Sequence, residues 1–240
     1  MKTVICKTYE EISKAAAEEI ASIVKENPKA TLGLATGSTP VGMYRELINK
    51  YENGELDFSE VTTFNLDEYY PISKDNDQSY DYFMRKNLFD HINISQGKTN
   101  IPNGNAADPI AECEKYEKKI EENGAVDIQV LGIGQNGHIG FNEPGDYLHT
   151  VTHITDLTES TINANARFFE SESDVPKKAL TMGLGTILKA KKILLLANGR
   201  SKHEAISALL DDKITTAIPA TLLKTHPNVI LICDEEAYYG

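Results

Sequence analysis

Three side chains able to exchange protons or hydrogen bonds lie close together in the middle of the chain. Asn136, His138 and Glu143 fall within eight residues. They belong to a glycine-rich stretch from Leu131 to Pro144, and the apolar run from Val126 to Leu131 that leads into it is typical of a buried parallel strand. A histidine between two hydrogen-bonding side chains at the end of such a strand predicts acid–base chemistry, because open α/β sheets place their ligands there.

The same stretch admits a second interpretation as a dinucleotide-binding turn. Gly132, Gly134 and Gly137 have the spacing G-x-G-x-x-G after a strand, which is the pattern of many nicotinamide-binding sites. That pattern binds a pyrophosphate only where a helix begins at the third glycine. Gly140 and the pair Pro144-Gly145 follow here, so a helix of three turns does not fit. A dinucleotide site is therefore disfavoured, and a plain glycine turn that happens to hold a histidine remains the alternative.

Two adjacent acids follow the apolar strand that we expect from Val61 to Leu66. The sequence there is Phe-Asn-Leu-Asp-Glu-Tyr, with the acids at Asp67 and Glu68. Adjacent acids after a strand usually lie in a solvated loop. Asp67, however, would lie at the carboxyl edge of the sheet, where a general base could act on a bound ligand.

A candidate phosphate cradle follows the strand expected from Thr31 to Thr36. Gly37, Ser38 and Thr39 offer backbone N–H groups and two hydroxyls just before a helix that would begin at Pro40. Thr39 as N-cap and Pro40 as first helical residue also make a good helix start with no ligand at all. Both interpretations stay open. The spacing and the missing lysine exclude a nucleotide P-loop.

Two cations further along the chain could neutralise a phosphate dianion. Arg167 lies beside Phe168 and Phe169, where an arginine can also simply extend over aromatic surface. Lys202 lies at the expected start of a helix after the strand Lys192–Ala197. A lysine there opposes the helix dipole, which a bound anion would offset.

The elements that must position these residues alternate along the chain. The expected strands are Thr3–Cys6, Thr31–Thr36, Val61–Leu66, Val126–Leu131, Val151–Thr155, Lys192–Ala197 and Asn228–Cys233. The expected helices are Tyr9–Glu26, Pro40–Tyr51, Ser79–Phe89, Asp108–Glu122, Thr158–Asn165, Lys177–Leu188 and Ser201–Leu210. This alternation predicts the α/β class, as a three-layer α/β/α sandwich with a mainly parallel, Rossmann-like sheet. Its 240 residues, 1–240, suit a single domain.

Composition limits the partners. The chain has 36 Asp and Glu against 24 Lys and Arg, giving a formal charge of -12, which disfavours nucleic acids and anionic membranes. A small anionic ligand needs only a local cluster of donors and stays possible. We expect neither disulfides nor a cysteine-rich metal site, since Cys6, Cys113 and Cys233 are scattered and odd in number. A membrane span and a secretory signal are both absent from the pattern, so we expect a soluble cytoplasmic protein.

Taken together, these motifs resemble the glucosamine-6-phosphate deaminases, the isomerising enzymes of amino-sugar catabolism. The resemblance is carried by Phe64–Tyr69 and above all by Gly134–Pro144, which ends in Phe-Asn-Glu-Pro. Leu34–Pro40, Ser160–Phe169 and Gly199–Lys202 match in the same order, so the likeness covers essentially the whole chain. Related 6-phosphogluconolactonases share the glycine-histidine turn but continue it differently.

The resemblance implies a reaction that converts glucosamine 6-phosphate and water to fructose 6-phosphate and ammonia, with neither metal nor organic cofactor. His138 would open the sugar ring, because imidazole can give and take a proton at neutral pH. Glu143 and Asn136 would hold the His138 ring and its tautomer, and Asp67 would move the proton from C2 to C1. By the same resemblance, the phosphate-binding residues are Gly37, Ser38, Thr39, Arg167 and Lys202.

Asn136 departs from the family pattern, in which many members have Asp at this place. An amide can orient His138 but cannot stabilise imidazolium as a carboxylate would, so Glu143 must be the charged partner. Two rival functions remain. A sugar-phosphate lactonase would need no carbon base and should tolerate loss of Asp67, and a non-catalytic sugar-phosphate sensor would not need the acid–base set.

Allosteric members of the family bind N-acetylglucosamine 6-phosphate between subunits, through basic residues after the Phe-Asn-Glu-Pro turn and a longer C-terminal segment. Residues 145–155 here hold no Lys or Arg, and the chain stops at Gly240 soon after its last expected strand. An effector can act only through differential binding. We therefore expect hyperbolic kinetics without activation by that effector, with the choice between monomer and homo-oligomer left open.

Overall fold

The structure is a computed structural model that describes residues 1–159, 161–162, 169 and 175–240. Its strands are β1 (Lys2–Cys6), β2 (Thr31–Leu34), β3 (Thr62–Asn65), β4 (Asp67–Tyr70), β5 (Thr99–Asn100), β6 (Ile128–Gly132), β7 (His153–Asp156), β8 (Lys178–Thr181), β9 (Ile193–Ala197) and β10 (Val229–Asp234). Its α-helices are α1 (Tyr9–Glu26), α2 (Val41–Glu52), α3 (Tyr80–Asn87), α4 (Pro109–Asn123), α6 (Leu184–Ile187), α7 (His203–Leu210) and α8 (Glu235–Tyr239). Short 3₁₀ helices are η1 (Phe89–His91), η2 (Gln96–Lys98), η4 (Arg200–Lys202) and η5 (Pro219–Thr225).

A seven-stranded sheet forms the centre of the molecule, in the order β1-β10-β9-β6-β2-β3-β5. Every neighbouring pair in it is parallel. The central strands are apolar and buried along their length, as Ile193–Ala197 illustrates, because helices shield them from water. Strands expected at the sequence level form six of the seven, and the expected three-layer α/β/α fold with a mainly parallel sheet is confirmed.

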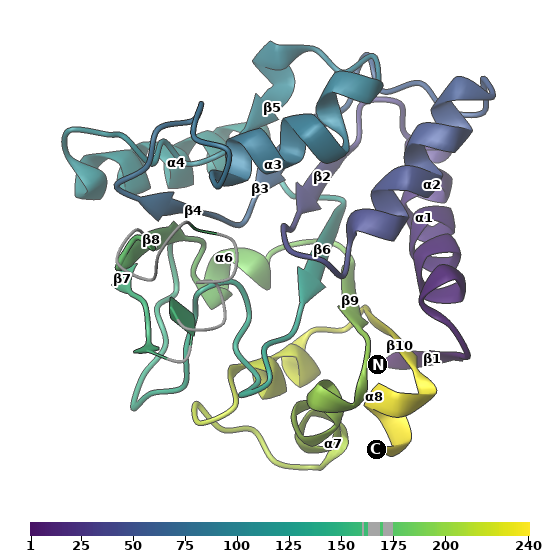
Figure 1. The fold of residues 1–240 in the computed structure, drawn as a ribbon, viewed down its shortest axis with the longest axis vertical. Coiled ribbons are helices and arrows are strands. Elements are labelled where there is room, and N and C mark those ends of the chain that lie inside the picture. The colour runs from purple at the N-terminus through teal and green to yellow at the C-terminus, as the bar shows by residue number, and fades with distance from the viewer. Residues whose placement is uncertain (160, 163–168, 170–174) are drawn as a thin grey trace.

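The helices lie around this sheet (Figure 1) and bury apolar side chains. In α1, Ile12, Ala16 and Ile20 recur at helical spacing and are fully buried, and the helix contacts α2, β9 and β10. The Thr8 hydroxyl caps α1 by accepting from the Glu11 N–H. At the other end of the chain, α8 packs beside α7, and both chain termini lie at that side of the molecule (Figure 1).

A second, smaller sheet was not expected from the sequence. It has the order β4-β8-β7, and both of its strand pairs are antiparallel. The prediction of one helix over Lys177–Leu188 is therefore wrong: residues 178–181 form β8, and only 184–187 form the short helix α6. The cause is tertiary, since Lys178–Thr181 pairs with a strand on each side and its helix-favouring residues yield to that pairing.

Two further expectations concern helix ends. Thr39 does not cap α2: the helix begins at Val41 after Pro40, without a side-chain cap, and the Thr39 hydroxyl instead donates to Asn198. Half of the helix expected from Thr158 to Asn165, residues 160 and 163–165, lies outside the described residues. The helix expected to end at Asn123-Gly124 does so, with Gly124 at a φ of 91°.

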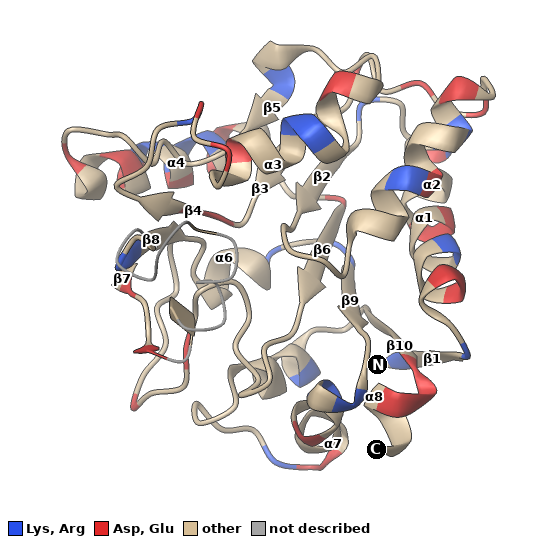
Figure 2. Ribbon diagram, viewed as in Figure 1, with Lys and Arg blue, Asp and Glu red and all other residues tan. Residues whose placement is uncertain are grey.

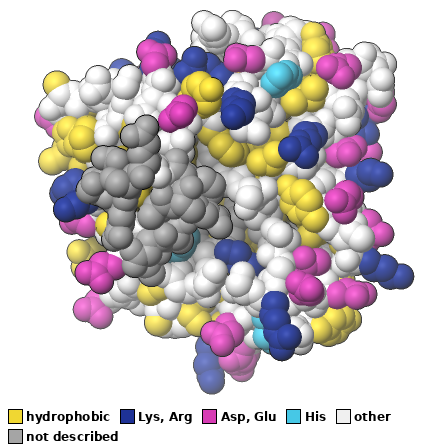
Figure 3. All heavy atoms as spheres, viewed as in Figure 1, with side chains coloured by type: hydrophobic (Ala, Val, Ile, Leu, Met, Phe, Trp, Pro, Cys, Tyr) yellow, Lys and Arg dark blue, Asp and Glu magenta, His cyan; other side chains and the backbone are white. Residues whose placement is uncertain are grey.

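Acidic side chains predominate on the outer helices α1, α4 and α8, while acids and bases are interspersed over the described part of the face in Figure 3 (Figures 2 and 3). Cys6, Cys113 and Cys233 are buried and free, as expected. None of the helices in the described ranges has the length and apolar character that a membrane span requires.

Candidate active site

Four neighbouring strands bring the predicted site residues to one edge of the sheet. The strands β9, β6, β2 and β3 lie side by side and run parallel, so their carboxyl ends share one edge. The turn with Lys202 follows β9, the glycine-histidine turn follows β6, the loop 37–39 follows β2, and Asp67 follows β3. Chain segments far apart in sequence therefore meet where parallel α/β sheets bind ligands.

The turn after β6 is shaped to hold His138. Its main chain closes on itself, since the Gly134 N–H donates to the His138 carbonyl at 2.9 Å and the Gly137 N–H to the Gly134 carbonyl at 3.0 Å. Gly137 has a φ of 79°, which a side chain would strain. A Cβ on Gly134 would lie 2.3 Å from His138 Nδ1, so the imidazole packs on the bare glycine backbone. No helix follows before β7, and the pyrophosphate-binding context is missing, as expected.

His138, Glu143 and Asn136 form one cluster. His138 Nδ1 lies 3.3 Å from Glu143 Oε1, and the Asn136 amide donates to Glu143 Oε2 at 2.7 Å. Asn136 Oδ1 also accepts from the backbone N–H of His138 at 3.2 Å. Asn136 thus acts on the imidazole through Glu143 and through the backbone, which is less direct than the ring contact that the sequence suggested.

Glu143 carries the negative charge of this cluster. Burial works to raise its pKa, but contacts with His138, the Thr161 hydroxyl and the Asn136 amide lower the pKa to about 2. The Thr161 hydroxyl donates to Glu143 Oε1 at 2.6 Å. Three contacts therefore keep this carboxylate ionised and fixed beside the imidazole. Thr161 was not among the predicted site residues, although it belongs to the stretch Ser160–Phe169 that carries part of the resemblance.

Asp67 lies beside this turn, in a buried position. Its exposed fraction is 6%, and its Oδ2 lies 3.2 Å from where a Cβ on Gly140 would be, so the carboxyl group faces the bare backbone two residues after His138. Burial raises the pKa of Asp67 to about 8, and the charge of neighbouring Glu68 adds to the shift. A carboxyl group with a pKa near the working pH is suited to take and return a proton.

Glu68 is buried as well, with 2% exposed, although adjacent acids usually lie in solvent. Its carboxylate accepts backbone hydrogen bonds from Tyr69 at 2.9 Å, from Tyr80 at 2.8 Å and from Asp81 at 3.0 Å. The last two belong to the first turn of α3, whose positive end favours an anion. Burial raises the pKa of Glu68 to about 7, against the lowering effect of these N–H groups. Sequence reasoning missed this anchor of β4.

Tyr9 of α1 contacts the loop of Gly37, Ser38 and Thr39 through its hydroxyl group. The Tyr9 hydroxyl lies 2.9 Å from the Ser38 carbonyl and 3.0 Å from the Thr39 carbonyl, and it accepts from the Gly42 N–H at 2.8 Å. Gly37 has a φ of 94°, which lets the chain turn sharply after β2. These contacts use the carbonyls of Ser38 and Thr39, while the Thr39 hydroxyl donates to Asn198 Oδ1 at 2.9 Å.

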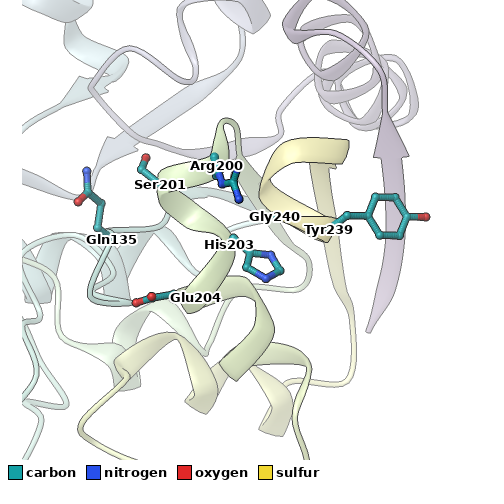
Figure 4. Close-up of a pocket in the computed structure, with 7 residues that line it drawn as sticks. All are labelled: Gln135, Arg200, Ser201, His203, Glu204, Tyr239 and Gly240. Carbon is teal, nitrogen blue, oxygen red and sulfur yellow. The ribbon is translucent and has the colours of Figure 1, made fainter.

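Lys202 ends η4, the turn after β9, and is half-buried. Burial lowers its pKa, and it makes no ion pair with any carboxylate in the described ranges. An uncompensated, partly desolvated cation favours an anionic ligand. Arg167, the other predicted cation, lies outside the described residues. Arg200 and Ser201 line one hollow with Gln135 of the glycine-histidine turn, so the two turns are neighbours (Figure 4).

This arrangement combines an acid–base pair, a separate buried carboxyl group and a cationic turn at one sheet edge. It can move protons between carbon and oxygen atoms of a small anionic ligand. The described residues contain no group of three or more His, Cys, Asp or Glu side chains that could hold a metal ion.

Comparison with known proteins identifies the family. The sequence model of the glucosamine-6-phosphate isomerases and 6-phosphogluconolactonases matches residues 7–231. The chain belongs to this glucosamine-6-phosphate isomerase/6-phosphogluconolactonase family. Its resemblance to that family, first suggested by the Phe-Asn-Glu-Pro turn, is thereby confirmed.

Within the glucosamine-6-phosphate isomerase/6-phosphogluconolactonase family, the chain is similar to curated glucosamine-6-phosphate deaminases over nearly its full length. It is 59% identical to that of Clostridium perfringens (strain 13 / Type A), over 99% of this chain and 98% of the relative. It is 57% identical to that of Thermoanaerobacter pseudethanolicus, over 99% of this chain and 94% of the relative.

Solved structures of the family agree. The fold matches that of a monomeric glucosamine-6-phosphate deaminase with a TM-score of 0.97 and 50% identity, covering 99% of this chain and 98% of that one. It also matches a 6-phosphogluconolactonase from Leishmania guyanensis with a TM-score of 0.77, covering 98% of this chain and 97% of that one. At 23% identity this second likeness concerns the fold alone.

Proposed function

We propose that this protein is a glucosamine-6-phosphate deaminase, which converts D-glucosamine 6-phosphate and water to D-fructose 6-phosphate and ammonia. Full-length relatives of that name at 59% and 57% identity support the proposal. The observation that carries it is Asp67, a buried carboxyl group beside the turn that holds His138. A carbon acid needs such a base, whereas hydrolysis of a lactone does not.

Ring opening is the first step. His138 takes the proton from the anomeric hydroxyl and delivers it to the ring oxygen, while the bond between C1 and that oxygen breaks and C1 becomes an aldehyde. Glu143, held at 3.3 Å from Nδ1, orients the imidazole and stabilises its protonated form. Asn136 holds Glu143 in place by its 2.7 Å hydrogen bond, which gives the neutral amide a role in positioning.

Isomerisation and deamination follow at C2. Asp67 removes the proton from C2 while the C1 oxygen takes a proton from the C2 ammonium group, which forms an enolamine between C1 and C2, and Asp67 then returns its proton to C1. C2 is then an imine carbon, to which water adds before ammonia leaves and the ketone forms. One carboxyl group thus serves both proton transfers, and every step uses groups of this chain and water.

The charge on the substrate amine makes Asp67 an effective base. In the free protein its pKa of about 8 keeps much of it protonated at neutral pH. Glucosamine 6-phosphate brings an ammonium group on C2, directly beside the proton to be removed. A cation so close favours the ionised carboxylate. Substrate binding therefore produces the base that the next step needs.

The phosphate group is assigned to the loop 37–39 and to Lys202. The loop offers N–H groups and hydroxyls near the amino end of α2, and Lys202 offers a cation without a carboxylate partner in the described ranges. Arg167 keeps its place in this set as a sequence-based assignment. We treat residues 1–240 as one catalytic domain for a small-molecule sugar phosphate.

The test is to incubate purified protein with glucosamine 6-phosphate and to assay ammonia and fructose 6-phosphate in the same samples. The proposal expects equal amounts of the two products at all times. In parallel, 6-phosphogluconolactone is supplied and its hydrolysis is measured above the uncatalysed rate. Rapid lactone hydrolysis with no ammonia from the amino sugar would replace the deaminase by a lactonase, and inactivity on both would favour a binding protein.

A further inference from the structure

One side chain outside the assigned site joins the two segments to which the proposed function assigns the phosphate. Asn198 follows β9 directly, and its Oδ1 accepts the Thr39 hydroxyl hydrogen at 2.9 Å. The strands β9 and β2 are not neighbours in the sheet, because β6 lies between them. The bond between Asn198 and Thr39 therefore spans the carboxyl end of β6 and ties the loop 37–39 to the turn that carries Lys202.

Each side of this bridge is anchored separately. The Gly199 N–H donates to both carboxylate oxygens of Asp234, at 3.0 and 2.8 Å, and Gly199 has a φ of 85°. The Lys202 N–H then donates to the Gly199 carbonyl at 3.0 Å, which fixes the turn from Asn198 to Lys202. On the other side, Tyr9 holds the carbonyls of the loop. The bridge thus joins two rigid segments and sets the distance between them.

The amide nitrogen of Asn198 takes no part in the bond to Thr39 and can donate to a ligand. With Oδ1 facing Thr39, the NH₂ group has two hydrogens to donate, and it has no acceptor among the residues that the structure describes. Asn198 is half-buried, and Lys202 lies four residues further along the same turn. Two N–H donors on the same turn as a cation fit an anion with several oxygen atoms.

We propose that Asn198 is a phosphate-specificity residue, which positions Thr39 through its carbonyl oxygen and donates its amide hydrogens to the substrate phosphate. This inference rests on the proposed function for the position of the phosphate. It adds a residue that bridges the loop after β2 and the turn after β9. The role concerns binding rather than proton transfer, so substitution of Asn198 should raise KM much more than it lowers kcat.

The experiment compares Asn198→Ala, Asn198→Asp and Thr39→Val with the wild-type protein. Binding of inorganic phosphate is measured by titration calorimetry, and KM and kcat are measured with glucosamine 6-phosphate. Asn198→Ala should weaken phosphate binding and raise KM by about tenfold, the loss of one or two hydrogen bonds to an anion, with a much smaller change in kcat. Asn198→Asp keeps an acceptor for Thr39 but adds a negative charge, so it should weaken phosphate binding more than Asn198→Ala does.

A double variant isolates the bridge. If Thr39 acts through Asn198, adding Thr39→Val to Asn198→Ala should cost clearly less than Thr39→Val alone costs in the wild type. The matched control is Asn228→Ala, which removes the same side chain at the opposite, amino end of β10, where its amide donates to the Lys191 carbonyl at 3.2 Å. Phosphate binding by Asn228→Ala should equal that of the wild type.

Wild-type phosphate affinity in Asn198→Ala, or equal affinities in Asn198→Ala and Asn198→Asp, would overturn the inference. Asn198→Asp retains the bridge, so it still decides the matter if Asn198→Ala does not fold. The phosphate titration needs no turnover. If the wild type binds phosphate but releases no ammonia from glucosamine 6-phosphate, the proposed function fails while the role of Asn198 is still judged on affinity.

Discussion

Asp67 and Glu68 place two carboxyl groups next to each other on β4, with little access to water. Glu68 receives three backbone N–H bonds, two of them from the start of α3, and is therefore the one better stabilised as an anion. Asp67 faces the glycine-histidine turn and holds its proton up to a higher pH. We therefore propose different roles for the two neighbours, with Glu68 as the anchor of the strand and Asp67 as the group that reacts.

This division makes a prediction about stability. An ordinary Asp has a pKa of about 3.9, whereas folded Asp67 has a pKa of about 8, so between these values the folded state holds a proton that the unfolded chain releases. Stability must then fall as the pH rises, and the loss levels off above about 8. Asp67→Asn should therefore have a larger free energy of unfolding than the wild type. This difference between variant and wild type should be at least about 1 kcal/mol larger at pH 8 than at pH 5.

Urea unfolding at both pH values measures this difference, and Asp90→Asn, at an exposed position on η1, is the matched control. An Asp67→Asn variant that gains no stability between pH 5 and pH 8 relative to the wild type would contradict the buried, protonated state of Asp67.

A second residue-scale prediction concerns the glycines of the turn. A Cβ at Gly134 would lie 2.3 Å from His138 Nδ1, so Gly134→Ala must displace the imidazole. Turnover should fall by about tenfold or more, because a displaced general acid–base group loses reach. Gly132→Ala is an ideal control within the same G-x-G pattern, since a Cβ there meets no atom within 4 Å.

Steady-state kinetics of the two variants, with phosphate binding as a second reading, distinguish a local effect from a loss of fold. If Gly134→Ala and Gly132→Ala had equal turnover, the contact between Gly134 and the His138 imidazole would have no part in catalysis. That result would remove His138 from the proposed step.

At the scale of elements, the sequence predicted the parallel strands and long helices well, because their signals are local. The helix Tyr9–Glu26 and the strand after Lys192 follow from periodicity, caps and apolar runs. The small sheet could not be predicted in this way. Its strand Lys178–Thr181 has helix-favouring residues and is a strand only because β4 and β7 pair with it.

The same reasoning explains which site residues were visible. Asp67, His138 and Glu143 could be predicted because they end apolar strands or belong to a distinctive turn. Glu68 was missed because its partners, the N–H groups of Tyr80 and Asp81, come from a helix twelve or more residues away. Asn198 was missed because its contact with Thr39 joins segments 159 residues apart.

A prediction about stability concerns Glu117, which joins three elements of the fold. This buried carboxylate of α4 accepts from the Thr152 N–H at 3.0 Å, from the Thr152 hydroxyl at 2.7 Å and from the Thr186 hydroxyl at 2.6 Å. It therefore ties α4 to the start of β7 and to α6. Glu117→Ala should lower the free energy of unfolding by about 2–4 kcal/mol, because it leaves these donors without an acceptor.

Chemical denaturation of Glu117→Ala and of Glu121→Ala gives the comparison, since Glu121 lies one turn further along α4 and is exposed, 3.7 Å from Lys189. A loss no larger than that of Glu121→Ala would mean that the buried bonds of Glu117 contribute nothing to holding the small sheet.

At the scale of the whole molecule, the order of the strands explains the site. The sequence order of the site segments is the loop 37–39, Asp67, the glycine-histidine turn and then Lys202, whereas the sheet order β9-β6-β2-β3 brings them together at one edge. In this order β6, which leads into the turn of His138, lies between β9 and β2, whose following turns are the proposed phosphate-binding segments, and β3, which leads to Asp67, lies on the other side of β2. An acidic chain with a formal charge of -12 can still bind an anionic sugar there, because the local donors at this edge decide the binding.

We propose that Asp67 moves the proton from C2 to C1 of a bound amino-sugar phosphate. The most direct measurement is the rate of ammonia and fructose 6-phosphate formation from glucosamine 6-phosphate by purified wild type and Asp67→Asn, with phosphate affinity measured on the same preparations. We predict equal amounts of both products from the wild type and a loss of at least about a hundredfold in turnover in Asp67→Asn, with phosphate affinity unchanged. Turnover by Asp67→Asn close to that of the wild type would contradict the account.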